Sequence, residues 1–150
     1  MAAGLFCCIT FLGMCSALMN HLRVLVADDH ELVRRGLRDI LNNTRFEVCG
    51  EAEDGQQAVD QTLQLKPDLV LLDMSMPVMT GLQAAATIRR LAPETKIIVV
   101  TMHDSPRMEK EARAAGADAY VTKMGAAKIL LSTMDSLFGS DPANGKDLPS

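Results

Sequence analysis

The sequence lacks the features of a nucleic-acid-binding protein. Its formal net charge is −4, its pI is about 5.3, and its basic residues are scattered rather than clustered. Nucleic acids are held by positively charged surfaces, so we expect no nucleic acid to be bound by this chain alone. At 150 residues, 48% of them hydrophobic, the chain can bury one contiguous core but has no room for a second domain.

The cysteines lack any CxxC or Cys/His spacing that suits a metal. Three of the four, Cys7, Cys8 and Cys15, lie near the start of the chain, and Cys49 lies further on. We interpret all four as reduced thiols.

Positive charge is also missing from the first part of the chain. The nearly all-apolar stretch from Ala2 to Met19 contains no Lys or Arg, and the first is Arg23. A signal peptide usually has a positive n-region, although Cys15-Ser16-Ala17 offers small residues for cleavage. A membrane-spanning helix needs about 20 apolar residues, a length that this stretch barely reaches. Alternatively, translation begins at Met19. We favour a non-native start, and a cytoplasmic protein, over membrane anchoring by residues 2–19.

From residue 22 onward, short apolar runs alternate with segments of helical period. Three of the runs are rich in Val, Leu and Ile without polar alternation, as in central strands of a parallel sheet covered on both faces. Strands are predicted at residues 23–27, 46–52, 69–73, 96–101 and 119–122. Helices are predicted around residues 33–41, 56–65, 82–91, 105–116 and 126–138. In the first helix, three arginines are expected on the solvent side: Arg34, Arg35 and Arg38.

Five βα units with short loops predict an α/β fold, a doubly wound five-stranded parallel sheet of flavodoxin-like type with strand order 2-1-3-4-5. We expect residues 1–21 to be an apolar extension, residues 22–138 the folded domain and residues 139–150 a disordered polar tail. Ligands of such sheets bind beyond the carboxyl ends of the strands, at the switch between the first and third strands.

Charged and polar residues stand at the carboxyl ends of four predicted strands. Asp28 and Asp29 follow the first strand, Asp73 ends the third, Thr101 ends the fourth and Lys123 follows the fifth. Each close pair of carboxylates costs on the order of a few kcal/mol at an effective dielectric of about 20, so the cluster requires a cation. Oxygen ligands with no His or Cys nearby favour a hard ion, and Mg²⁺ is the expected cofactor.

This constellation suits transfer of a phosphoryl group. Asp73 is the expected nucleophile and would form an acyl phosphate, with Mg²⁺ and Lys123 neutralising charge on the phosphoryl oxygens. The Thr101 hydroxyl can donate to the new group and draw its loop inward, which leaves space for Tyr120 to swing inward. Asp28 or Asp29 alone could equally cap the next helix, whereas Asp73 has no immediate helix to cap.

Two motifs resemble the receiver domain of two-component response regulators, over roughly residues 22–138. The run from Val24 to Leu37, VLVADDHELVRRGL, resembles the subfamily whose receivers usually precede a LuxR-type helix-turn-helix output domain. The run LLDMSMP ending at Pro77, followed by Gly81, resembles the phosphoacceptor strand and turn. The resemblance implies that Asp29, Asp73 and the Ser75 carbonyl bind the ion directly, with Asp28 acting mainly through water.

The resemblance also implies partners. A sensor histidine kinase or a phosphotransfer protein would donate the phosphoryl group. Small acyl or carbamoyl phosphates would also donate it, but slowly. The sequence departs from the family pattern in two ways. Met124 directly follows the lysine, and the output domain is missing. We therefore expect a stand-alone receiver or a fragment of a longer DNA-binding transcriptional regulator. The wide apolar stripe of residues 126–138 suggests a homodimer contact there, or on the face formed by the preceding helix and the last strand.

Three other functions compete with a signalling switch. A hydrolase that passes through an aspartyl phosphate usually has a second acid two residues after its nucleophile, where Ser75 stands here, so turnover would be slow. A flavin-binding module would need a phosphate loop after the first strand, and Asp28 and Asp29 would repel that phosphate. The third is a receiver-like scaffold that is never phosphorylated. The presence of the complete set of site residues argues against it: Asp28, Asp29, Asp73, Thr101 and Lys123. We therefore expect a phosphoacceptor rather than an enzyme, with no small-molecule cofactor.

Overall fold

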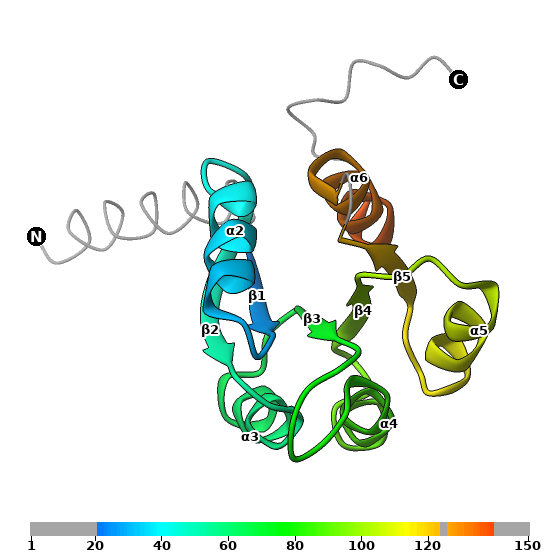
Figure 1. Ribbon diagram of the computed structural model, residues 1–150. Helices are drawn as coiled ribbons and strands as arrows, with labels where there is room; N and C mark the ends of the chain where they lie inside the picture. Colours follow the sequence, from blue (N-terminus) through cyan, green and yellow to red (C-terminus); the bar gives the residue numbers. More distant parts are fainter. Residues whose placement is uncertain (1–20, 124–125, 140–150) are drawn as a thin grey trace, which may run out of the picture.

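The computed structural model describes residues 21–123 and 126–139. Within these ranges, strands and helices alternate along the chain (Figure 1). The strands are β1 (Leu22–Ala27), β2 (Phe46–Ala52), β3 (Leu69–Asp73), β4 (Lys96–Thr101) and β5 (Ala119–Thr122). The helices are α2 (Glu31–Leu41), α3 (Gly55–Leu65), α4 (Gly81–Leu91), α5 (Pro106–Ala114) and α6 (Ala126–Phe138).

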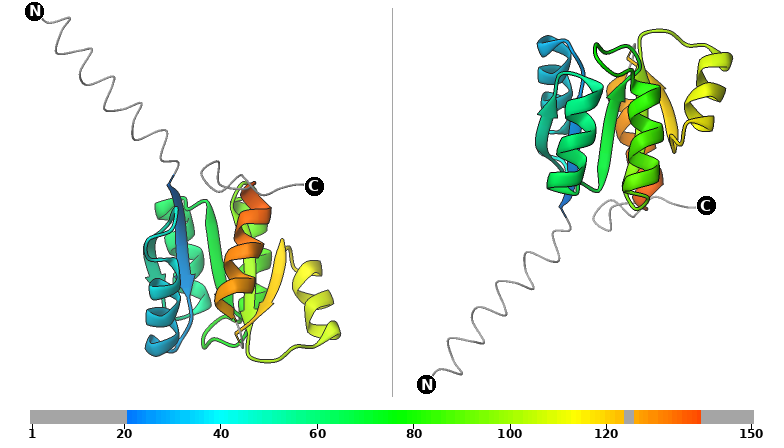
Figure 2. Two further views of the ribbon diagram at one scale, coloured as in Figure 1. Left: turned by 90° about the horizontal axis from the view of Figure 1, so that it is seen from above. Right: turned by 90° about the horizontal axis from the view of Figure 1, so that it is seen from below.

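The described strands form one parallel 5-stranded sheet in the order β2-β1-β3-β4-β5, which confirms the predicted fold class and topology. Helices α2 and α6 cover one face, and α3, α4 and α5 cover the other (Figures 1 and 2). Because every strand runs in the same direction, all five carboxyl ends meet at one edge of the sheet.

Alternate residues of the central strands enter two separate cores. Leu25, Val70 and Ile97 pack beneath α3 and α4, whereas Val26, Leu71 and Ile98 pack beneath α2 and α6. All six side chains are fully or almost fully buried. This is why the runs are apolar at consecutive positions rather than at every second one.

Three helices begin at side chains that cap their first turn. Asp54 accepts a hydrogen bond from the Gln57 amide at the start of α3, and the Ser105 hydroxyl accepts one at α5. Thr80 and Gln83 form a reciprocal capping box at α4. These caps lie just beyond the carboxyl ends of the strands and therefore fix the loops around that edge.

The first helix departs from the prediction at one arginine. Arg35 and Arg38 are exposed as expected, but Arg34 is only 8% exposed, so its predicted solvent position is wrong. Arg34 lies on the buried face of α2 together with Leu37 and Leu41. Its guanidinium is tolerated there because each of its three nitrogens has an oxygen partner, as described below.

Several sequence-based expectations lie outside the described residues. These are the interpretation of the apolar start, the polar tail, and the departure at Met124. Among the described helices, none combines the length and the apolar character that crossing a membrane requires. On α6, Leu130 and Met134 are buried and Ile129 is 52% exposed.

Arg45, in the loop between α2 and β2, joins the start and the end of the folded chain. Its carbonyl accepts a hydrogen bond of 2.8 Å from the Leu22 amide, where β1 begins. Its guanidinium binds Asp135 at 2.8 Å and the carbonyl of Gly139 just beyond α6. The two ends of the described chain are therefore fastened at the edge of the sheet opposite the carboxyl ends.

Candidate functional site

The carboxyl edge of the sheet brings the predicted site residues into one place. Asp28 follows β1, and Asp73 and Thr101 are the last residues of β3 and β4. Asp73, Thr101, Lys123 and Ser75 line one pocket of about 320 Å³, together with His30, Val33, Met102 and His103. A larger pocket, at Arg38 and Asn42, lies elsewhere, beside the end of α2 and the start of β2.

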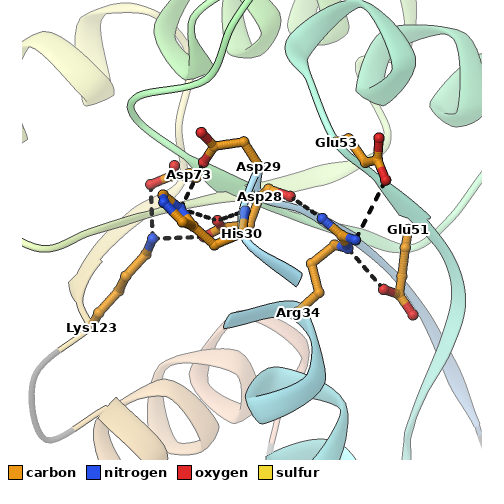
Figure 3. A network of polar contacts seen from close by, with 8 residues as sticks. All are labelled: Asp28, Asp29, His30, Arg34, Glu51, Glu53, Asp73 and Lys123. Atoms are coloured by element: carbon orange, nitrogen blue, oxygen red, sulfur yellow. Dashed lines mark hydrogen bonds and ion pairs between the residues drawn. The ribbon is translucent and has the colours of Figure 1, made fainter. Parts of the chain in front are cut away.

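Lys123 joins the two buried carboxylates (Figure 3). Its ammonium lies 2.6 Å from Oδ2 of Asp28 and 3.0 Å from Oδ1 of Asp73. The three side chains are 11%, 2% and 8% exposed, respectively. A buried charge needs a close partner of opposite sign, and here one cation serves two anions.

His30 is a site residue that the sequence analysis missed. Its Nδ1 lies 2.9 Å from Oδ1 of Asp29 and 3.4 Å from Oδ1 of Asp28. The expectation of an oxygen cluster with no histidine nearby is therefore wrong. The signal was present, because His30 directly follows Asp29.

The loop from β3 to α4 approaches Asp73 closely. Ser75 is exposed at the pocket, whereas Met74 and Met76 are buried. The Met79 amide donates to the Pro77 carbonyl at 2.7 Å, which closes a three-residue turn centred on Val78. Val78 has a φ of 68° and is 81% exposed, an unfavourable conformation for a β-branched residue. The backbone is therefore strained at Val78, in the loop that follows Asp73.

Thr101 and Tyr120 are both tied to the loop that follows β4. The buried Thr101 hydroxyl accepts a hydrogen bond of 3.3 Å from the His103 amide. A hydroxyl that accepts one hydrogen bond can still donate its own proton. The Tyr120 hydroxyl donates to the His103 carbonyl at 2.7 Å. His103 therefore connects the two residues through its backbone.

The pKa of the Asp73 carboxyl is raised above its ordinary value, chiefly by burial. Burial raises the pKa of its carboxyl, and the negative charges of Asp28 and Asp29 raise it further, against the opposing effect of Lys123. Burial alone would lower the pKa of Lys123, but its hydrogen bonds and charge interactions with Asp28 and Asp73 raise it overall. Lys123 thus stays charged but does not neutralise the cluster.

The donor set fits a small divalent cation. The carboxylates of Asp28, Asp29 and Asp73 are the hard oxygen ligands that Mg²⁺ accepts, and Ser75 lines the same pocket as Asp73. Three carboxylates lie close to a single lysine here, and the charges of Asp28 and Asp29 add to burial in raising the pKa of Asp73. Asp28, Asp29 and His30 also place one ligand atom each within 4.8 Å of one another.

Asp73→Asn is expected to stabilise the metal-free protein by about 1 kcal/mol at neutral pH, because it removes one of three close negative charges. The folded-state pKa of Asp73 is raised, so the folded protein is favoured by protonation of Asp73, and this advantage is lost as pH rises through the folded pKa. The stability gain of the variant should therefore be full above that pKa and vanish below the unfolded value of about 3.9.

Urea denaturation of both proteins across this pH range measures the effect. Asp104→Asn is the control, since Asp104 is exposed in the loop after β4 and should change stability by less than about 0.5 kcal/mol at every pH. If the difference in the free energy of unfolding between wild type and Asp73→Asn does not depend on pH, the raised pKa of Asp73 is contradicted.

The model of the family described as "Response regulator receiver domain" matches residues 24–135, which is most of the chain. The chain belongs to this family. This receiver is 41% identical over 101 residues to the chemotaxis protein CheY of Thermotoga maritima, covering 67% of this chain and 84% of that protein. It is 37% identical over 128 residues to the response regulator UvrY of Escherichia coli, covering 85% of this chain but 59% of UvrY.

Among solved structures, the receiver is similar to a two-component response regulator of the LuxR family from Aurantimonas sp. SI85-9A1. The TM-score is 0.75 at 29% identity, and the match covers 82% of this chain and 91% of that one. These similarities confirm the predicted family, including the likeness to receivers of LuxR-family regulators. Membership supports phosphorylation-dependent signalling as the function of this domain.

Proposed function

We propose that this receiver is a signalling switch that accepts a phosphoryl group on Asp73 from a sensor histidine kinase or a phosphotransfer protein. The observation that carries the proposal is the buried contact of Lys123 with both Asp28 and Asp73 at the carboxyl edge of the sheet. An ionised carboxylate held beside a cation in a pocket is suited to attack phosphorus and to keep the product anion in place.

In the proposed step, a carboxylate oxygen of Asp73 forms a bond to phosphorus while the bond from phosphorus to the donor's imidazole nitrogen breaks. The leaving imidazole takes up a proton, and the product is an acyl phosphate. Lys123 stays between Asp28 and Asp73 and pairs with a phosphoryl oxygen. Bound Mg²⁺, held by Asp28, Asp29, Asp73 and the Ser75 carbonyl, would supply further positive charge to the phosphoryl oxygens.

The switch is proposed to use Thr101 and Tyr120. The Thr101 hydroxyl can donate a hydrogen bond to the phosphoryl group, which draws the loop after β4 toward Asp73. Tyr120 is hydrogen-bonded to the same loop through His103, so its ring should move with it. A dimer or partner contact on α6, at the exposed Ile129, or on the face of α5 and β5 would then report phosphorylation.

Other parts of the proposal follow from the same residues. Slow hydrolysis is expected because Ser75 stands where an acid would activate water. Residues 22–138 are proposed as the receiver domain of a cytoplasmic protein. Any DNA-binding function would belong to a longer protein, as the match to part of UvrY allows.

The test is incubation with acetyl phosphate and Mg²⁺, followed by mass spectrometry of the intact chain. We expect one added phosphoryl group that is lost in base, is absent without Mg²⁺ and is absent in Asp73→Asn. Asp104→Asn should be labelled like the wild type, because this exposed acid lies outside the cluster. Labelling that persists in Asp73→Asn would show that another residue is the nucleophile.

A further inference from the structure

Arg34 is a buried cation of α2 that the proposed phosphoryl transfer does not use. Its Nη1 donates to the Asp28 carbonyl at 2.7 Å, and its Nε donates to Oε1 of Glu51 at 3.0 Å. Its Nη2 also lies 3.6 Å from Oε1 of Glu53. Figure 3 shows the guanidinium between the end of β1 and the two glutamates of β2 and the following loop.

The Asp28 carbonyl is at a critical place in the backbone. The Asp28 amide makes a 3.0 Å hydrogen bond to Ala52, and the chain then turns away from the sheet toward α2. The carbonyl belongs to the peptide unit that joins Asp28 to Asp29, so its orientation sets the directions of both carboxylates. A buried carbonyl also requires a hydrogen-bond partner, and Arg34 provides it.

The effect of Arg34 on the cluster is geometric rather than electrostatic. Its positive charge is taken up by Glu51, which also binds Arg38 at 2.6 Å. The charges that shift the pKa of Asp73 are instead those of Asp28, Lys123 and Asp29. An arginine suits this position because its planar fork can hold a carbonyl and a carboxylate at the same time, which a lysine ammonium on a flexible stem cannot do as rigidly.

We propose that Arg34 is a positioning residue, which holds the peptide between Asp28 and Asp29 so that both carboxylates stay beside Asp73 and Lys123, and that Glu51 in turn holds its guanidinium. The inference rests on the proposed function, because it assigns a second layer of residues to the same cation and phosphoryl site. Residues that orient metal ligands in this way commonly change metal affinity by 10-fold to 100-fold when replaced.

The test compares Arg34→Met with Arg38→Met in the full chain. Both variants remove an arginine that binds Glu51 from the same helix, but only the first removes the contact with Asp28. Calorimetric titration with Mg²⁺ should show affinity reduced at least about tenfold in Arg34→Met and changed by less than about twofold in Arg38→Met. Thermal unfolding of each variant separates this effect from a general loss of stability.

A second readout does not require the metal. In amide NMR spectra of the metal-free protein, Arg34→Met should shift or broaden the signals of Asp29 and His30, and Arg38→Met should leave them in place. If Arg34→Met does not fold, Arg34→Lys takes its place, with an affinity loss of at least about threefold expected from the missing fork.

Equal effects of the two variants on Mg²⁺ affinity, or unchanged amide signals in Arg34→Met, would overturn the inference. A wild-type protein that takes up no Mg²⁺ would instead count against the proposed function, and the NMR comparison would still decide the role of Arg34.

Discussion

Lys123→Met is expected to destabilise the metal-free protein by about 3 kcal/mol at neutral pH, the lower end of the cost of breaking a buried ion pair. The substitution leaves two buried carboxylates, those of Asp28 and Asp73, facing each other without a cation. The pKa of Asp73 is already raised by burial and by its neighbours, and removal of the lysine would raise it further. Part of the lost stability should therefore return as pH falls and Asp73 takes up a proton.

Urea denaturation at several pH values, with and without Mg²⁺, measures this. Lys128→Met is the matched control, since Lys128 is exposed on α6 and should change stability by less than about 0.5 kcal/mol. Mg²⁺ should restore more stability to Lys123→Met than to the control, because the divalent cation would replace the missing charge. If the two variants lose the same stability, Lys123 has no special role in balancing the cluster.

Gly81→Ala should have an effect of similar size for a steric reason. Gly81 is the first residue of α4, and a Cβ atom there would lie 2.1 Å from the carbonyl oxygen of Asp73. The obstacle is backbone, which cannot turn aside as a flexible side chain can. Helix α4 would have to move away from β3, at a cost of about 2–3 kcal/mol. Because the steric clash is with the backbone of Asp73, the rate of phosphorylation should also fall.

Gly36→Ala is the same chemical change without the obstacle. Gly36 lies inside α2, and an added Cβ there would meet nothing within 4 Å. Replacing a glycine inside a helix by alanine usually stabilises by about 0.5–1 kcal/mol. Chemical denaturation of the two variants should therefore give changes of opposite sign. A loss of stability in Gly36→Ala would contradict the open space around that residue. No loss in Gly81→Ala would show that the close approach to Asp73 does not require a glycine at position 81.

The sequence was sufficient to predict the sheet and the residues at its carboxyl edge. Parallel strands buried on both faces require consecutive apolar residues, so runs such as LVLLD could be located directly. Once the strand order was predicted, the convergence of Asp28, Asp73 and Lys123 followed from the common direction of the strands. The strand limits differ from the prediction only at Leu22, which extends β1 by one residue.

The contacts that the sequence did not reveal depend on register and on side-chain direction. Arg34 is buried because Glu51 lies beside β1, and that placement follows a register shift between Val24 and Leu25 that no local pattern shows. The turn of the His30 ring toward Asp29 likewise depends on a rotamer. Periodicity gives the face of a helix on which a residue lies, but not the partner that makes a charge tolerable there.

The junction at Arg45 has a consequence for how a signal could travel through a larger assembly. Because both ends of the described chain are fastened at the edge opposite the pocket, they lie about one strand length, roughly 20 Å, from the carboxylate of Asp73. A neighbouring module that packs at this edge would therefore sense the length or tilt of the elements between, or the surfaces that they expose, rather than the phosphoryl group itself.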